Sequence, residues 1–351
     1  MCIFLYFLKG AKEMIPWQKN EKDSLIEAEV MEEIYQKLRT PLKCGPVMKL
    51  EDKFTDSPSI FRLNDCYCMY FVTISKECST SGYETHLAVS KDLRHWEDKG
   101  TVLERDGSDR WDSRQIAGYA AFMQIAFEGD HELKRIGGEY CLFYLGGNQD
   151  GYEPDPLYTG MVLCADPMAP STYRRMGGPI LSPCDADCRP GEEKTIYKHF
   201  PFEDSARATG YPYVDFYNAK DREDRERIYL AVSEDGIHWE RYGDGPALDQ
   251  ITDDPEGRIC GDPQILKIGD LYVMLYFRYR RGAGAYNTFA CSRDLICWTP
   301  WEGKPLIEPE FAWEDVHAHK SCFLRENGIN YHFYCAVNSR NERFIALAVS
   351  G

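Results

Sequence analysis

The chain has 351 residues, 43% of them hydrophobic and 13% aromatic, with a formal net charge of −16. This composition can bury a sizeable core and predicts an aromatic-rich globular fold. The acidic charge argues against a nucleic-acid partner, because binding to phosphates needs clustered lysines and arginines.

The first residues form a poor targeting signal. The segment MCIFLYFL is apolar over only about seven residues, no basic stretch precedes it, and no clear small-residue cleavage site follows it. No other run is long and apolar enough to span a membrane. We therefore expect a cytoplasmic protein without a membrane partner, with a periplasmic or secreted location left open.

The fourteen cysteines follow neither a disulfide nor a zinc pattern. No CxxC pair occurs, and several cysteines lie inside apolar runs, so we expect reduced, buried thiols. The cysteines in apolar runs are Cys66, Cys68, Cys141, Cys291 and Cys335.

One helix is predicted near the N-terminus, over residues 24–39. Its apolar side chains recur every four residues at Ile26, Val30, Ile34 and Leu38, which is one stripe of a helical period. Pro41 ends it. We expect residues 1–40 to form a helical arm that packs on its own sheets or on a neighbouring subunit.

From residue 54 onward the sequence consists of short aromatic and β-branched runs broken by Gly, Asn and Asp, which is typical of strands. One phrase recurs as LAVSKDLRHW (87–96), LAVSEDGIHW (230–239) and FACSRDLICW (289–298), and more weakly at 160–168 and 345–351. Repeated four-stranded meanders close radially. The sequence therefore predicts an all-β, five-bladed β-propeller over residues 41–351, whereas a β-sandwich would need no such repeat.

Polar clusters precede the first strand of each predicted blade. An aspartate before Pro or Ser is commonly a turn residue, but its recurrence at blade starts favours a common site at the channel mouth. The pair of histidines lacks a third ligand at a recognisable spacing, so no metal site is predicted. The residues expected around this ring are Asp56, Asp112, Asp215, Asp262, His317 and His319.

Several acids beside a titratable third group suit glycosidic bond cleavage. One group must protonate the leaving oxygen, and another must activate water or attack the sugar. Aromatic side chains near these acids could stack on sugar rings or simply pack: Trp111, Tyr119, Tyr152, Tyr211, Tyr286 and Trp313. The basic run at Arg278, Arg280 and Arg281 could hold an anionic substituent or pair with nearby acids.

The blade phrase, the openings TDSP and GDPQ, and the closing AHK before NYHFYCAVN resemble the five-bladed glycosidases of glycoside hydrolase families 43 and 117. The resemblance covers residues from about 41 to the C-terminus. It implies Asp56 as the base, Asp262 as an orienting acid and His319 as the general acid. The helix resembles the arm that family 117 enzymes exchange between subunits, which implies a homodimer.

Two departures from family 117 concern the acid. Lys320 follows the histidine in place of an acidic residue, and the acid of family 43 would be a glutamate, for which Glu203 and Glu153 are candidates. The substrate that family 117 implies, an anhydro-galactose linkage of red-algal polysaccharides, is one option among several.

We therefore expect an exo-acting, inverting hydrolase of plant or algal oligosaccharides that needs no cofactor. The predicted substrate-binding residues are Asp112, Gln115, Tyr152, His199, Asp215, Gln264, Arg278, His317 and Lys320. Two alternatives stay open. One is a family 130-like phosphorylase, with phosphate held by Arg278, Arg280, Arg281 and His319; the other is a non-catalytic carbohydrate-binding propeller.

Overall fold

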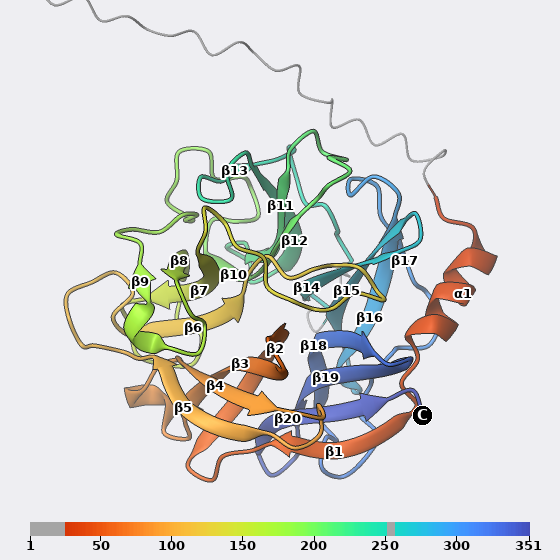
Figure 1. The fold of residues 1–351 in the computed structure, drawn as a ribbon, viewed down its shortest axis with the longest axis horizontal. Coiled ribbons are helices and arrows are strands. Elements are labelled where there is room, and N and C mark those ends of the chain that lie inside the picture. The colour runs from red at the N-terminus through yellow and green to blue at the C-terminus, as the bar shows by residue number, and fades with distance from the viewer. Residues whose placement is uncertain (1–24, 251–256) are drawn as a thin grey trace, which may run out of the picture.

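The computed structural model describes residues 25–250 and 257–351. Within these ranges the protein consists of antiparallel sheets with one α-helix, so the predicted all-β class is confirmed. The sheets lie around a common centre (Figure 1). Two short 3₁₀ turns, η1 (Cys78–Thr80) and η2 (Pro170–Thr172), lie in the connections.

Three sheets have four strands each, paired in chain order. The first contains β2 (Lys53–Leu63), β3 (Cys66–Ser75), β4 (Glu84–Ser90) and β5 (Glu97–Leu103). The second contains β6 (Gln115–Ala120), β7 (Tyr140–Gly147), β8 (Tyr158–Cys164) and β9 (Arg174–Arg175). The third contains β10 (Thr195–Glu203), β11 (Tyr213–Lys220), β12 (Glu226–Ser233) and β13 (Glu240–Arg241).

The remaining strands form one eight-stranded sheet with two meanders. One meander contains β14 (Cys260–Ile268), β15 (Leu271–Arg280), β16 (Gly284–Ser292) and β17 (Thr299–Pro300). The other contains β18 (His317–Glu326), β19 (Ile329–Val337), β20 (Arg343–Val349) and, from the N-terminal end of the described residues, β1 (Leu42–Met48). Tyr286 and Ala318 form the parallel bridge between the meanders.

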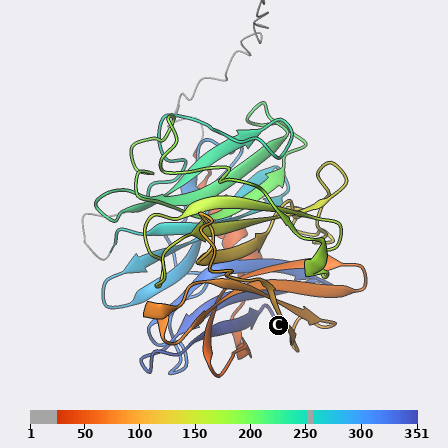
Figure 2. The same cartoon turned by 90° about the vertical axis from the view of Figure 1, so that its left-hand side faces the viewer.

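Strand β1 runs antiparallel to β20, with Leu42 opposite Val349. The red-orange and blue ends of the described protein therefore lie side by side (Figures 1 and 2). This pairing completes the hydrogen bonds of β20 and joins both ends in one sheet.

The recurring sequence phrase folds into the same turn at each strong copy. Strands β4, β12 and β16 end at its serine, as predicted. In the first copy, Ser90 donates a hydrogen bond to Asp92, whose Oδ1 accepts the backbone N–H groups of Arg94 and His95, both at 2.9 Å. The same bonds recur around Asp235 and Asp294. The aspartate thus satisfies the turn's backbone donors.

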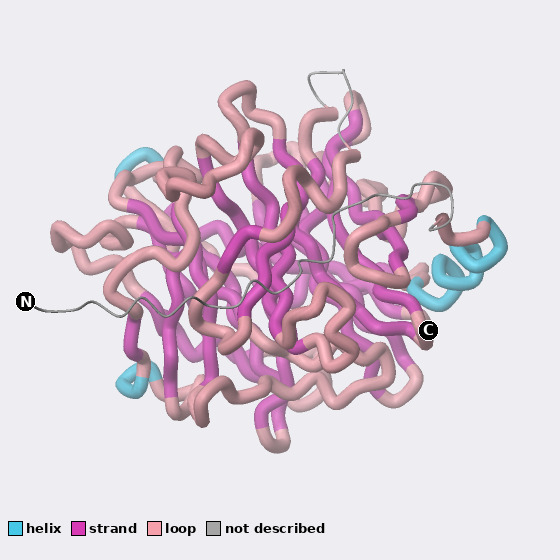
Figure 3. Tube along the Cα trace, turned by 90° about the horizontal axis from the view of Figure 1, so that it is seen from above, coloured by secondary structure: helices cyan, strands magenta, loops and turns pink. Residues whose placement is uncertain are grey.

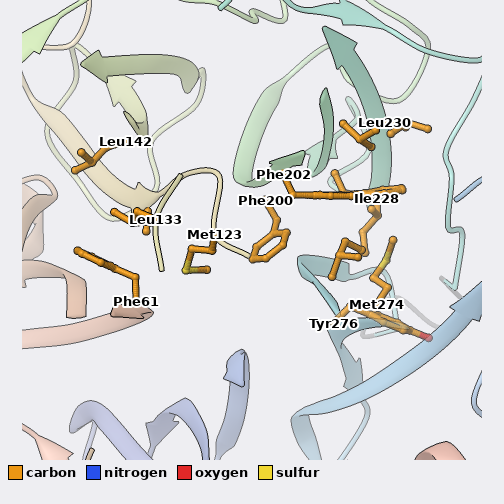
Figure 4. Packing of buried hydrophobic residues seen from close by; sticks show 14 of the residues in the cluster. Phe61, Met123, Leu133, Leu142, Phe200, Phe202, Ile228, Leu230, Met274 and Tyr276 are labelled. Atoms are coloured by element: carbon orange, nitrogen blue, oxygen red, sulfur yellow. The ribbon is translucent and has the colours of Figure 1, made fainter. Parts of the chain in front are cut away.

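Buried side chains from different sheets meet in one large cluster. Figure 4 shows Phe61 of β2, Phe200 of β10 and Tyr276 of β15 in this cluster, and all three are buried. Cys68, Cys141, Cys291 and Cys335 are buried free thiols as predicted, and Cys66 is half-buried. None of the described helices is long and apolar enough to cross a membrane.

Helix α1 (Ala28–Leu38) lies outside the strands at one edge of the molecule (Figure 3). It is shorter than the predicted span, which began at Ser24, outside the described residues. Ile34 and Leu38 are buried against the sheet that contains β14, β15 and β16. The division of the sequence at residue 40 and the homodimer through this arm stay predictions.

We predict that Leu38→Ala lowers the free energy of unfolding by about 2–5 kcal/mol, because the leucine is fully buried between α1 and the sheet. Urea denaturation followed by intrinsic fluorescence measures the change. Glu33→Ala, at an exposed position of the same helix, is the control and should change stability by less than about 0.5 kcal/mol. Equal stability of Leu38→Ala and the wild type would show that the helix is not held by this face.

Candidate active site

A cavity of about 170 Å³ lies at the N-terminal ends of the inner strands β2, β14 and β18, next to the start of β12. Its lining combines carboxylates, cations, histidines and tyrosines that come from every sheet. The charged and polar side chains are Asp56, Tyr83, Tyr119, Tyr152, Glu153, Tyr197, Lys198, Asn218, Glu226, Asp262, Tyr279, His317, His319, Lys320 and Arg343.

A β-bulge on each of these three inner strands aims side chains into the cavity. The residues in the bulges have a left-handed backbone, with φ of 48° at Ser57, 53° at Asp262 and 59° at Lys320. Such conformations cost non-glycine residues of order 1–3 kcal/mol and cluster at functional sites. The structure therefore brings Asp56, Asp262 and His319 together, although they are far apart in sequence.

Gly261 holds in β14 the place that Asp56 holds in β2. A Cβ atom added at Gly261 would lie 2.8 Å from Nδ2 of Asn218, closer than real Cβ atoms approach. The glycine therefore leaves room for the Asn218 amide, and Asp262, one residue later, supplies the carboxylate of this strand.

Asp56 is the anion of a buried ion cluster. Its Oδ2 accepts hydrogen bonds from Arg343 and from Lys320 Nζ at 3.2 Å, while Oδ1 accepts the backbone N–H of Ser57 at 2.7 Å and its hydroxyl at 3.4 Å. Burial alone would raise the pKa of Asp56, but the two cations hold it well below its usual value. Both oxygens are thus fully occupied, since a carboxylate offers about four acceptor positions.

Glu226, at the start of β12, is the protonated carboxyl of the site. Burial and the nearby charge of Glu153 raise its pKa to about 8. Its Oε2 accepts a hydrogen bond from Asn218 Nδ2 at 3.0 Å, and Asn218 Oδ1 in turn accepts the backbone N–H of Asp262 at 3.2 Å. That second bond fixes the orientation of the amide, so the proton of Glu226 is placed on Oε1.

Glu153 is the carboxylate with a free oxygen. Its Oε1 accepts hydrogen bonds from the Tyr83 hydroxyl at 3.2 Å and Lys320 Nζ at 3.4 Å. None of the described residues donates a hydrogen bond to Oε2, which belongs to a residue lining the cavity. Lys320 thus joins Glu153 to the Asp56 cluster.

Both histidines of the cavity are neutral. Burial, followed by the charge of Lys320, holds the pKa of His319 well below its usual value, and its Nδ1–H donates to the Cys335 carbonyl at 3.2 Å. Burial and Arg343 lower the pKa of His317 to about 4, and its Nδ1 accepts the Ala285 N–H at 3.1 Å. His319 Nε2 is therefore an acceptor and His317 Nε2 is a donor.

Three predicted sugar-binding residues lie outside the cavity lining because they are bonded within the sheets. Asp112 is fully buried and accepts hydrogen bonds from Arg110 at 2.8 and 3.0 Å and from the Tyr144 hydroxyl at 2.7 Å. Asp215 accepts from His199 Nδ1 at 2.6 Å. These side chains stabilise the fold.

The other placements also correct the sequence-based assignment. Gln264 bonds the backbone of Phe323 with both ends of its amide, at 2.8 and 2.7 Å, and so bridges two strands. Arg278 contacts Gln250, Arg280 pairs with Glu308, and neither lines the cavity. Glu203 pairs with Lys134 at the surface, whereas the other candidate glutamate, Glu153, does line the cavity. Tyr152, His317 and Lys320 are where they were expected.

Gln115 positions the loop that carries Glu153. Its Nε2 donates to the carbonyls of Gln149 at 2.7 Å and Gly151 at 3.1 Å, and its Oε1 accepts the Tyr83 N–H at 2.8 Å. It therefore holds the two segments whose side chains meet at Glu153 Oε1, without lining the cavity itself.

Sequence reasoning missed Glu226 and Arg343, together with Lys198 and Asn218. Glu226 follows the charged run DREDR and Arg343 follows NSRNE, and both runs resemble solvated turns. The available signal was position: each is the first or second charged residue before an apolar strand, at a strand start.

No model of a known protein family matches the sequence, and no curated protein is similar to it in sequence. Among solved structures, one described as a complex of BT0996 and RGII shares 37% identity at a TM-score of 0.86, covering 92% of this chain and 95% of that one. A second, described as a glycoside hydrolase, shares 36% identity at a TM-score of 0.87, covering 93% and 96%. The protein belongs to the glycoside hydrolases.

A thermostable family-43 glycoside hydrolase is a more distant neighbour of this enzyme. It shares 16% identity at a TM-score of 0.61, covering 86% of this chain and 95% of that one. Such a likeness concerns the fold alone, so membership of families 43 or 117 stays a prediction. The predicted glycosidase is confirmed.

We predict that Gln115→Leu lowers kcat/KM of this glycoside hydrolase by about 100-fold, because a displacement of a reacting group by about 1 Å costs that much. Assays on a cleaved glycoside measure it, and circular dichroism checks the fold. The control is Gln124→Leu, since the Gln124 amide accepts the Asp130 N–H at 2.8 Å and does not line the cavity. Unchanged kcat/KM in Gln115→Leu would show that the loop does not need this clamp.

Proposed function

We propose that the cavity cleaves a terminal sugar from an oligosaccharide by hydrolysis, with Glu226 as the general acid and Glu153 as the carboxylate on the opposite side of the bond. The observation that carries this proposal is the pair of glutamates in one cavity, one with a pKa raised to about 8 and one with a free oxygen. Such a difference in environment assigns the acid and base roles in glycosidases.

In this mechanism Glu226 donates the proton on Oε1 to the leaving glycosidic oxygen as that bond breaks. Asn218 bonds Oε2 and keeps the proton on the other oxygen. Glu153 takes a proton from the water that attacks the anomeric carbon, through its free Oε2, which gives an inverting reaction. Asp262 remains an orienting acid, as the sequence suggested.

These assignments replace those of Asp56 as base and His319 as acid, for two physical reasons. The oxygens of Asp56 are occupied by Lys320, Arg343 and Ser57, which leaves no acceptor position for a water. His319 is neutral because its burial lowers its pKa, so it has no extra proton to donate near neutral pH. Asp56 instead keeps the two cations in place.

The size of the cavity supports exo action, since 170 Å³ is small beside the range of about 300–1,000 Å³ of common ligand sites. We propose that it holds one sugar unit of a plant or algal oligosaccharide. The neighbour described as a complex with RGII makes RGII fragments the first substrates to test.

Phosphorolysis has less support, because Arg278 and Arg280 lie outside the cavity lining. An assay with and without inorganic phosphate separates the two reactions, since a phosphorylase would be inactive without it. A purely sugar-binding propeller has little use for a protonated and an ionised glutamate in one cavity.

We further propose that the sheets form a five-bladed propeller. Three four-stranded sheets would be three blades, and the two meanders of the eight-stranded sheet would be two more, joined by only one bridge. Strand β1 would complete the last blade by pairing with β20.

We predict that Glu226→Gln lowers turnover of an oligosaccharide by about 10²–10⁴-fold, the usual worth of a general acid. A nitrophenyl glycoside, whose leaving group departs without a proton, should be affected much less. Glu153→Gln should lose activity on both substrates, and Glu203→Gln, at the surface, on neither. Near-normal oligosaccharide turnover by Glu226→Gln would remove Glu226 from the mechanism. Proton NMR of the first product tests inversion.

The pH profile follows from the same group. Because Glu226 acts in its protonated form, kcat/KM should fall about tenfold per pH unit above its pKa of about 8. Stopped assays from pH 5 to pH 10 on the oligosaccharide measure this limb. With the nitrophenyl glycoside the limb should be much weaker, and a flat profile for both substrates would contradict the assignment.

A further inference from the structure

We infer that Lys198 and Asp262 form a subsite that binds one hydroxyl group of the sugar in the cavity. The inference rests on the proposed function of the cavity and adds to it the part of the substrate that is recognised. Lys198 comes from β10 and Asp262 from β14, both line the cavity, and each residue is only 5% exposed.

The two charged groups face each other without a hydrogen bond. Lys198 Nζ and Asp262 Oδ2 are 3.9 Å apart, which is beyond hydrogen-bond distance. Asp262 Oδ2 is buried and has no hydrogen-bond partner among the described residues. None of the hydrogen bonds within the described part of the protein involves Lys198 Nζ, although Lys320 and Arg343 in the same cavity both bond carboxylates directly.

Unpaired buried polar groups of this kind are expensive, at about 1–3 kcal/mol each. The backbone keeps the carboxylate at this distance: Asp262 has a φ of 53° in its bulge, and its N–H is bonded to Asn218 Oδ1 at 3.2 Å. The pair therefore stays open by one small polar group while the rest of the protein holds it still.

A sugar hydroxyl has the chemistry to fill this gap. It accepts a hydrogen bond from the Lys198 ammonium through oxygen and donates its own hydrogen to the Asp262 carboxylate. A C–H group can do neither, so a sugar lacking the hydroxyl leaves both charges unpaired. Sites of this type reject the analogue without the hydroxyl strongly.

The position of the subsite links recognition to the chemistry. Asn218 bonds both the backbone of Asp262 and the acid Glu226. A hydroxyl held between Lys198 and Asp262 therefore belongs to the sugar unit that lies beside Glu226, whose glycosidic oxygen receives the proton.

The test uses a nitrophenyl glycoside that the full-length enzyme cleaves, with its complete series of monodeoxy analogues. One deoxy position should lower kcat/KM of the wild type by about 100-fold or more, and the others by less. In Lys198→Met and in Asp262→Asn the penalty at that position should shrink to a few-fold, which a purely structural role would not produce. Lys134→Met, outside the cavity, is the matched control and should keep the full penalty.

Calorimetric binding of the corresponding monosaccharide and its deoxy analogues to Glu226→Gln gives a second reading that needs no turnover. Hydroxyl-dependent binding without any hydrolysis by the wild type would overturn the proposed function and support the subsite. Hydrolysis with equal rates for all analogues, or a penalty that persists in both variants, would overturn the subsite and leave the function. Absence of both binding and turnover over the sugar panel would overturn both.

Discussion

The ion cluster of Asp56, Lys320 and Arg343 is the interaction on which the site depends. It joins β2 to β18 and β20, so it ties the first sheet to the last at the cavity. Burying these charges is costly, and removal of one partner from such a set leaves an uncompensated buried charge. The cluster is therefore stable only as a complete set, and only if the first and last strands are joined in register, as the pairing of β1 with β20 does.

The cluster also decides which carboxyl keeps its proton. Lys320 and Arg343 are bonded to Asp56, and Lys320 reaches Glu153 as well. Glu226 receives only a neutral amide donor, from Asn218. Burial and the Glu153 charge then act on it with little compensation, and its pKa rises. The acid is thus made by the distribution of cations rather than by any property of the residue itself.

Strain and incomplete pairing occur together at this cavity. The bulges place Ser57, Asp262 and Lys320 in left-handed conformations, and the Asp262 carboxylate is left without a hydrogen bond from Lys198, the cation that faces it. The regular parts of the sheets carry the cost, through turns such as that of Asp92 and through the shared core. A rigid ring of sheets can hold such groups at fixed distances, which a loop-based site could not do as well.

The sequence by itself determined the local structure and part of the site. The phrase ending in Ser, Asp and Trp encodes its own turn, so strands, repeats and the all-β class were readable, and Asp56, Asp262 and His319 followed from their place before strands. Only the tertiary structure decided which side chains face one cavity and which are bonded inside the sheets, as for Asp112 and Asp215. It also revealed Glu226, because a pKa depends on burial and on neighbours that lie far away in the sequence.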